Sequence, residues 1–332
     1  MLDLPFMVRF LLRRLLIIPI ALLGINFVGF AYAHFALRYQ QAQNPWGSAA
    51  VDEQVPVLTL YADYARGLLR GDWGQMPTGV SQSVAEAVTN AAGGSIGLLA
   101  IVLGVSLLGG LGVGLWAVKI EPARIAPWLV PASAVGLALP GFYIGIVLVA
   151  GVVYVALAGG PGTKPVLPLQ GLGWDLHVVM PALALLVRPL AQMAQVSAGL
   201  LSGELNRPYI VAARSRGNTW ARARWKHALR NVLAPILLAM AGSFRLVVGE
   251  QILVEWFFGW AGLGRLLALA LVPPRLAGPG GLHTEGVYFL HPPLVAALLT
   301  AYALVFLTVD LLASLMVRWT DPRLRAAEGE HK

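Results

Sequence analysis

The sequence predicts an all-α fold, a polytopic bundle of six transmembrane helices with both chain ends in the cytoplasm. Hydrophobic residues make up 58% of the 332 residues and charged residues only 12%, whereas a soluble globular protein carries about 25% charged residues. Six apolar runs are long enough to cross a bilayer at about 1.5 Å per residue. Of the 24 Lys and Arg residues, sixteen fall in loops on one side of these runs and six on the other. The richer side is predicted to be cytoplasmic.

The apolar runs define the predicted helices in chain order. The six predicted spans are 15–36, 95–118, 127–158, 176–201, 232–258 and 294–317. A cleaved signal peptide is the rival interpretation of the first span, because residues 31–33 read Ala-Tyr-Ala, a spacing that a signal peptidase accepts. The apolar run is longer than the core of a typical signal peptide, which favours an uncleaved helix. Pro131 and Pro140-Gly141 predict a kink in the long third span.

The chain is predicted to have two parts. Residues 1–94 hold the first span and a small extracytoplasmic lobe, and residues 95–332 hold the other five spans. Apolar residues recur at helical spacing in the lobe, which predicts an amphipathic helix. This helix would lie on the membrane surface, cover the transport path or simply pack within the lobe. Its apolar residues are Val57, Leu60, Tyr61, Tyr64 and Leu68.

The loop at residues 204–235, here called the elbow, carries the strongest functional signal. It holds seven Lys and Arg residues against one acid, and the positive-inside rule alone would account for that charge. The order of its residues also predicts its local structure. Residues 204–216 can form one helix, Gly217 suits a left-handed helix end, and a second helix can begin at Asn218 or Thr219. A helix-glycine-helix elbow with exposed arginines and tryptophans favours a docking surface.

Several blocks of the sequence resemble the membrane permeases of ATP-binding cassette importers, most closely the peptide and nickel branch. In the elbow, Tyr209-Ile210, Ala213-Arg214, Gly217 and residues 227–231 (His-Ala-Leu-Arg-Asn) resemble the EAA-type loop of that family. Val211 stands where many relatives carry the Glu of the motif, and Pro208 where this branch often has an acid. Further similar blocks are residues 8–24, Leu139–Tyr143, Phe258–Arg265 and Asp321–Arg323.

The resemblance implies a role for the elbow. In that family the loop forms a coupling helix that seats in a groove of the ATPase subunit. Trp220 and Arg224 lie four residues apart and are expected to enter such a groove together. The implied coupling loop covers 202–231, and its expected ATPase-coupling residues are Tyr209, Ala213, Arg214, Gly217, Trp220, Arg224, His227, Arg230 and Asn231.

Charged residues also fall at or within the predicted spans, where a charge costs at least about 2.5 kcal/mol at the bilayer centre. They are therefore expected to face the bundle interior or a wet cavity. Arg245, Glu250 and Glu255 share the helix after the elbow and are predicted to line or gate a pathway. The structural alternative is an ion pair between Arg245 and Glu250. Structural pairing is predicted for Asp310. The residues are Arg245, Glu250, Glu255, Arg188 and Asp310.

No catalytic, cofactor or metal site is predicted. The chain has no cysteine and no phosphate-binding glycine loop ending in Lys-Ser or Lys-Thr. The six histidines are scattered, and His283 with His291 is the one pair that could bind something together. The basic residues lie beside apolar spans rather than on one face of a soluble domain, which excludes nucleic acid as a partner.

The resemblance implies a multi-pass permease of the inner membrane that forms half of a translocation pathway for peptides or similar small solutes. Its implied partners are a second homologous permease, two cytoplasmic ATP-binding subunits that hydrolyse ATP, an extracytoplasmic substrate-binding protein and membrane lipid. Residues 273–293 are predicted to cap the outer side against the binding protein. The alternatives are a nickel-chelate permease of the same family, an ion-coupled secondary transporter or a structural membrane protein.

Overall fold

The computed structural model describes residues 4–43, 55–76, 82–120, 123–160, 162–273 and 288–320. This part of the chain is almost entirely helical, as predicted. It contains six helical runs that are long and apolar enough to cross a membrane, which confirms the predicted number of spans. They are Arg14–Gln43, Val84–Ala117, Gly141–Ala158, Leu176–Leu205, Trp220–Phe257 and Pro292–Leu315. The predicted outer cap at 273–293 lies outside the described residues except for its two ends.

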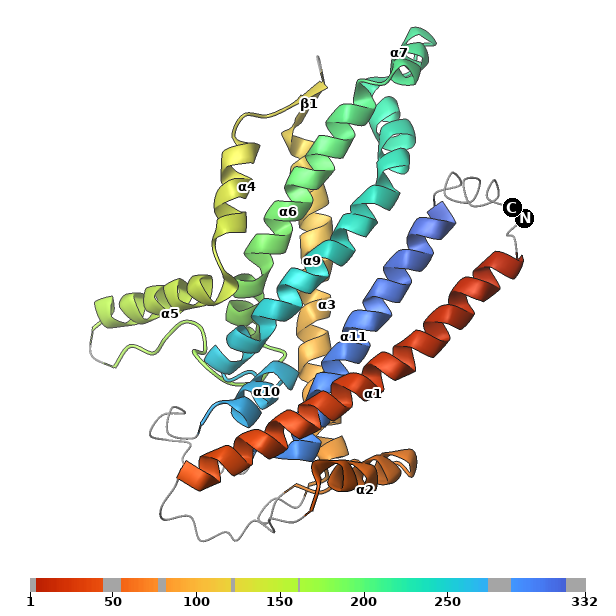
Figure 1. The fold of residues 1–332 in the computed structure, drawn as a ribbon. Coiled ribbons are helices and arrows are strands. Elements are labelled where there is room, and N and C mark those ends of the chain that lie inside the picture. The colour runs from red at the N-terminus through yellow and green to blue at the C-terminus, as the bar shows by residue number, and fades with distance from the viewer. Residues whose placement is uncertain are drawn as a thin grey trace. The chain divides into compact units, whose positions relative to one another are not determined.

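Figure 1 shows the order of the elements along the chain. A two-residue gap separates the short strands β1 (Val118–Ile120) and β2 (Ala123–Ile125), which pair antiparallel. The helices are α1 Leu4–Gln43, α2 Val57–Leu69, α3 Val84–Ala117, α4 Leu129–Ala138, α5 Gly141–Ala158, η1 Leu176–Val178, α6 Val179–Leu205, α7 Pro208–Ser215, α8 Trp220–Arg222, η2 Ala223–Ala228, α9 Leu229–Phe257, α10 Leu263–Leu271 and α11 Pro292–Thr320.

The chain forms two compact units, Met1–Gly94 with Gly262–Thr308, and Ser95–Ala261 with Val309–Lys332. In the first unit, α2 packs on α1 through aromatic rings. The Phe27 and Tyr61 rings meet edge to face at 4.9 Å, and the Phe30 and Tyr64 rings stack at 5.2 Å. The predicted apolar face of the lobe helix therefore contacts the first span through Tyr61 and Tyr64, rather than other described parts of the lobe.

Helices α1 and α11 approach closely in the same unit. The amide of Asn26 donates a hydrogen bond to the Thr300 hydroxyl at 3.0 Å. One turn on, a side chain at Gly29 would place its Cβ 3.2 Å from the Ala296 Cα and 2.9 Å from a methyl of Leu299. The absence of a side chain at Gly29 therefore lets the two helices approach closely, as small residues do between membrane helices.

Helix α6 is the centre of the second unit, where it packs against α4, α5 and α9. Helix α3 also meets it closely. A Cβ at Gly110 would lie 2.4 Å from the Met193 Cβ, and one at Gly114 would lie 2.7 Å from the Ser197 Cβ. Gly110 and Gly114, four residues apart on α3, therefore let this helix pack closely against α6.

The predicted third span differs from the structure. Instead of one kinked helix over 127–158, the chain forms the short helix α4 and the longer α5, with a break at Leu139 and Pro140. Proline has no N–H to donate and restricts the residue before it to extended backbone, which ends α4. Figure 1 shows that α5 leaves this break in a different direction from α4.

An apolar cluster in the second unit supports the base of the elbow. Leu201 and Leu205 at the end of α6 pack with Ile210 of α7 and with Ala223 and Ala228 of η2. The hairpin formed by β1 and β2 contributes Val118, and the residues that flank this hairpin, Ala117 and Ala126, belong to the same cluster. The short helices of the elbow are therefore built onto the end of α6 rather than left as an unsupported loop.

Candidate functional site

The elbow contains the glycine turn and the helix start that its sequence predicts. Gly217 has a φ of +85°, a conformation that glycine adopts at little cost. The Thr219 hydroxyl accepts a hydrogen bond from the backbone N–H of Arg222 at 3.3 Å and caps α8. The first predicted helix differs, because α6 extends to Leu205 and α7 begins at Pro208. Proline forces the preceding Arg207 into extended backbone.

A hydrogen-bonded triad closes the elbow at its base. The Tyr209 hydroxyl donates to the Glu204 carboxylate at 2.7 Å, and the Asn231 amide donates to the same carboxylate oxygen at 3.0 Å and to the Tyr209 oxygen at 3.1 Å. Burial, together with the hydrogen bond to Glu204, raises the pKa of Tyr209 to about 12. The triad joins the end of α6, the start of α7 and the start of α9.

Trp220 is occupied inside the elbow. The Arg214 guanidinium lies 4.6 Å from the centroid of its ring, a distance typical of a cation–π contact. The same guanidinium donates to the Asn218 carbonyl at 2.8 Å. Trp220 also packs on the apolar cluster at the base of the elbow. Ala213 of α7 is buried. These contacts hold α7 and α8 at a fixed angle across Gly217.

Trp225 is the tryptophan that projects from the elbow. It lies on η2, a π-helical turn at Ala223–Ala228, and it is 60% exposed. Arg230 and Asn231 are exposed near it, and Arg224 and His227 are half-buried. π-turns are frequent at functional sites. Trp225 is not among the coupling residues that the family resemblance implies, and its position on a π-helical turn cannot be recognised from the sequence.

Glu250 and Arg188 form an ion pair between α9 and α6. The second oxygen of Glu250 accepts a hydrogen bond from the backbone N–H of Gly141 at 2.9 Å. The pair predicted as an alternative, Arg245 with Glu250, does not form in the described structure. Arg245 instead pairs with Asp310 of α11, with a distance of 2.9 Å between Nη2 and Oδ1. The predicted pairing of Asp310 is therefore observed.

Arg245 and Glu255 lie in opposite surroundings. The Arg245 side chain is 63% exposed in the middle of α9. Glu255 is completely buried, and its carboxylate accepts hydrogen bonds from the Ser95 hydroxyl at 2.7 Å and from the Gln251 amide. Of the three predicted pathway residues, only Arg245 has a side chain that is mostly exposed.

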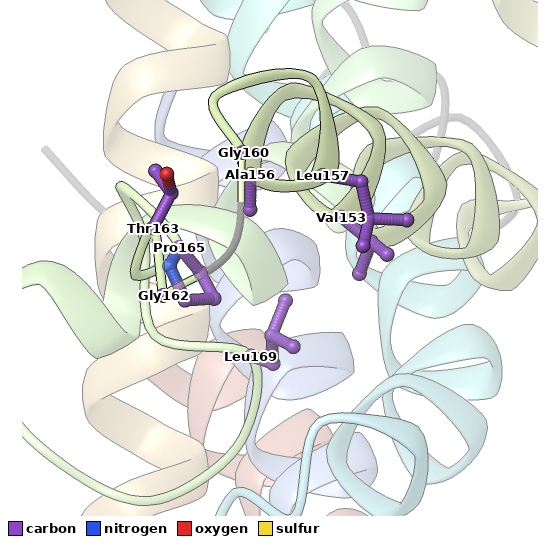
Figure 2. A pocket seen from close by; sticks show the side chains of 8 residues that line it. All are labelled: Val153, Ala156, Leu157, Gly160, Gly162, Thr163, Pro165 and Leu169. Carbon is purple, nitrogen blue, oxygen red and sulfur yellow. The ribbon is translucent and has the colours of Figure 1, made fainter.

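The described residues contain no cluster of three or more His, Cys, Asp or Glu side chains that could hold a metal ion. His291 is half-buried, and His283 lies outside the described residues. Figure 2 shows an open pocket of about 530 Å³ between the end of α5 and the following loop. The side chains that line the pocket are apolar apart from the Thr163 hydroxyl. They therefore do not form a catalytic group of polar side chains.

Comparison with known proteins places these features in context. Residues 110–326 match the model of the family described as binding-protein-dependent transport system inner membrane component. The oligopeptide transport system permease protein AppB of Bacillus subtilis is 24% identical, over 96% of this chain and 99% of AppB. The oligopeptide transport system permease protein OppB of Mycobacterium bovis is 26% identical, over 97% of this chain and 100% of OppB.

Proposed function

Because the chain belongs to the family of binding-protein-dependent transport system inner membrane components, we propose that it forms half of the pathway through which an ATP-driven importer takes up peptides. The family is a multi-pass membrane component and not a catalytic subunit. Peptide is the proposed cargo because the similar permeases AppB and OppB are named for oligopeptide transport and match this chain along almost its whole length. Nickel chelates are the rival cargo within the same family.

The elbow is the observation that carries this proposal. It is basic, rigidly folded across Gly217 and continuous with the membrane helices α6 and α9. A partner that binds it can therefore move both helices. The proposed partners are two cytoplasmic ATP-binding subunits at the elbows, a second homologous permease in the membrane and a substrate-binding protein outside. The orientation with both ends inside belongs to the proposal and rests on the asymmetry of basic residues.

We divide the predicted coupling residues between two roles and add one residue to them. Tyr209, Asn231, Arg214 and Trp220 form contacts within the elbow, so we assign them the role of keeping it rigid. Trp225 projects from it and is added as the anchor for the ATPase groove, because exposed aromatic residues commonly dominate such contacts. Arg224, His227 and Arg230 flank this anchor.

Arg245, Glu250 and Glu255 are retained as the proposed pathway or gate residues. Arg245 has the strongest support, because a guanidinium 63% exposed in a membrane helix cannot face lipid without a large cost. A wet pathway beside α9 and α11 removes that cost. Glu250 and Glu255 are engaged by neighbouring helices, so they would act by holding the walls of the pathway in place.

Reconstitution tests the proposal. The chain is purified with its proposed partners, inserted into vesicles and supplied with the binding protein and a radiolabelled oligopeptide. Uptake that requires ATP hydrolysis by a separate subunit supports the importer, and nickel supplied in place of peptide tests the rival cargo. Uptake driven by a proton or sodium gradient without ATP would contradict the proposal and support a secondary transporter.

A further inference from the structure

Glu250 joins three helices of the second unit at one point. Its Oε2 accepts the hydrogen bond from the Gly141 N–H at 2.9 Å, and its Oε1 pairs with the Arg188 guanidinium. Glu250 belongs to α9 and Arg188 to α6, and Gly141 is the first residue of α5. We call these three residues the Glu250 junction. One carboxylate thus holds two helices besides its own.

At the junction, a side chain at position 141 would be crowded by its neighbours. A Cβ at Gly141 would lie 2.7 Å from Glu250 Oε2 and 3.0 Å from the carbonyl oxygen of Ala184. The first N–H groups of a helix have no partner within the helix, and the positive end of the helix dipole favours a negative charge there. The carboxylate satisfies both requirements, so it fixes where α5 begins and how close it sits to α6.

The three helices differ in how they connect to the elbow. Helix α6 runs directly into the elbow, and α9 follows directly from it. Helix α5 has no such connection, because it starts after the break at Pro140 and ends in the loop that follows Ala158. A movement that begins at the elbow therefore reaches α5 through its contacts with α6 and α9, or through the chain that leads from α5 to the start of α6. Among these contacts, the Glu250 junction combines a charge with a backbone hydrogen bond.

We infer that Glu250 is a positioning residue for transport, which fastens the start of α5 to α6 and α9 so that movement of the elbow is passed on to α5. The inference rests on the proposed function, because it requires an elbow that moves with ATP-binding subunits. Energetic coupling between distant sites needs a contiguous network of contacts with two arrangements. The junction supplies the contact between the elbow-linked helices and the helix that lacks its own link.

Two double variants separate this role from that of an ordinary ion pair. Arg188→Glu with Glu250→Arg keeps an ion pair, but a guanidinium has no acceptor for the Gly141 N–H. Arg188→Gln with Glu250→Gln removes both charges and keeps an amide oxygen that can accept that N–H. Each variant is reconstituted with the partner subunits, and peptide uptake and ATP hydrolysis are measured in the same vesicles.

The measured quantity is the amount of peptide imported per ATP hydrolysed. We expect the charge-exchanged variant to import about tenfold less peptide per ATP than wild type, and the neutral variant to lose clearly less of this ratio than the charge-exchanged one. The reverse order would show that the charge pair alone matters and would overturn the inference. A loss of folding lowers uptake and ATP hydrolysis together and leaves their ratio unchanged, so the ratio reports coupling.

Two glycines of α5 provide a matched test. Gly141→Ala adds a methyl group against Glu250 and should lower the ratio of import to hydrolysis. Gly151→Ala adds the same group where no atom lies within 4 Å, and it should leave the ratio unchanged. Equal ratios in both variants would overturn the inference. Absence of ATP-dependent uptake in the wild-type complex would instead remove the proposed function, so the two failures can be told apart.

Discussion

Tyr209 closes the base of the elbow through its hydroxyl group, which both donates to Glu204 and accepts from Asn231. The sequence predicted Tyr209 and Asn231 as functional residues only through the family resemblance. Glu204 is the single acid of the elbow, and its sequence context predicts no role for it. The triad could not be derived from spacing, because Asn231 lies 27 residues from Glu204, and no local pattern relates positions that far apart.

Tyr209→Phe removes the donor of this triad and is expected to lower the free energy of unfolding by about 1 kcal/mol or less at neutral pH, because the site is partly exposed. The raised pKa of Tyr209 adds a pH dependence. The neutral hydroxyl is favoured in the folded chain, so its contribution is complete below pH 10.0 and is lost as the pH rises toward about 12.

Thermal unfolding of the purified protein from pH 7 to pH 12 measures both effects. The difference between wild type and Tyr209→Phe should shrink above pH 10. Tyr154→Phe is the control, because the Tyr154 side chain lies exposed on α5. A difference that stays constant up to pH 12 would show that the hydroxyl of Tyr209 does not contribute through its protonation state.

The two tryptophans of the elbow are expected to behave differently. Trp225→Ala removes a projecting ring and should weaken recovery of the ATP-binding subunit on purification, with a cost of about 2 kcal/mol in binding and little change in thermal stability. Trp220→Ala removes the ring beneath Arg214 and should lower the thermal stability of the chain first. If Trp220→Ala alone impairs subunit recovery at unchanged stability, the predicted anchor at Trp220 is right and the one at Trp225 is wrong.

At the scale of elements, the helix-glycine-helix form of the elbow follows from its sequence, because glycine tolerates a positive φ that other residues avoid. Thr219 is likewise a residue type that caps helices. The break at Asn206 and Arg207 is explained by Pro208. The π-turn at Ala223–Ala228 could not be predicted, since it depends on how the elbow packs onto α6 and the hairpin.

Gly217→Val should distort the elbow, because a left-handed conformation costs a residue with a side chain about 1–2 kcal/mol and a β-branched one more. Gly217→Asn is the matched control, since asparagine adopts this conformation more readily. Peptide uptake and recovery of the ATP-binding subunit are measured for both. Normal uptake by Gly217→Val would show that the elbow has no coupling role and that its basic residues only set the orientation of the chain in the membrane.

At the scale of the whole chain, length and hydropathy were enough to predict six spans, because the bilayer itself sets the length of a spanning helix. Ion pairing was harder to predict. Residues five apart on a helix point about 140° away from each other, so the considered Arg245–Glu250 pair was geometrically unfavourable. The partners that form, Asp310 and Arg188, lie 65 and 62 residues away in the chain and depend on how whole helices are rotated.

The orientation of the chain can be tested by cysteine labelling, because the natural sequence contains no cysteine. Thr59→Cys on α2 should react with a membrane-impermeant maleimide in intact cells. Ser215→Cys in the elbow should react only after the membrane is permeabilised. Both side chains are exposed in the structure. Labelling of Ser215→Cys in intact cells would contradict the proposed orientation with both ends inside.

The unbroken helical run from the elbow through α9 gives the molecule a long lever. It covers 38 residues, Trp220–Phe257, and at 1.5 Å per residue its length is about 57 Å. If such a rod is tilted by about 5° at one end, its far end is displaced by about 5 Å, the pitch of one helical turn. If the elbow docks on an ATP-binding subunit as proposed, an adjustment there too small to break any helix is large enough to exchange one set of side-chain contacts for the next at the far end of α9.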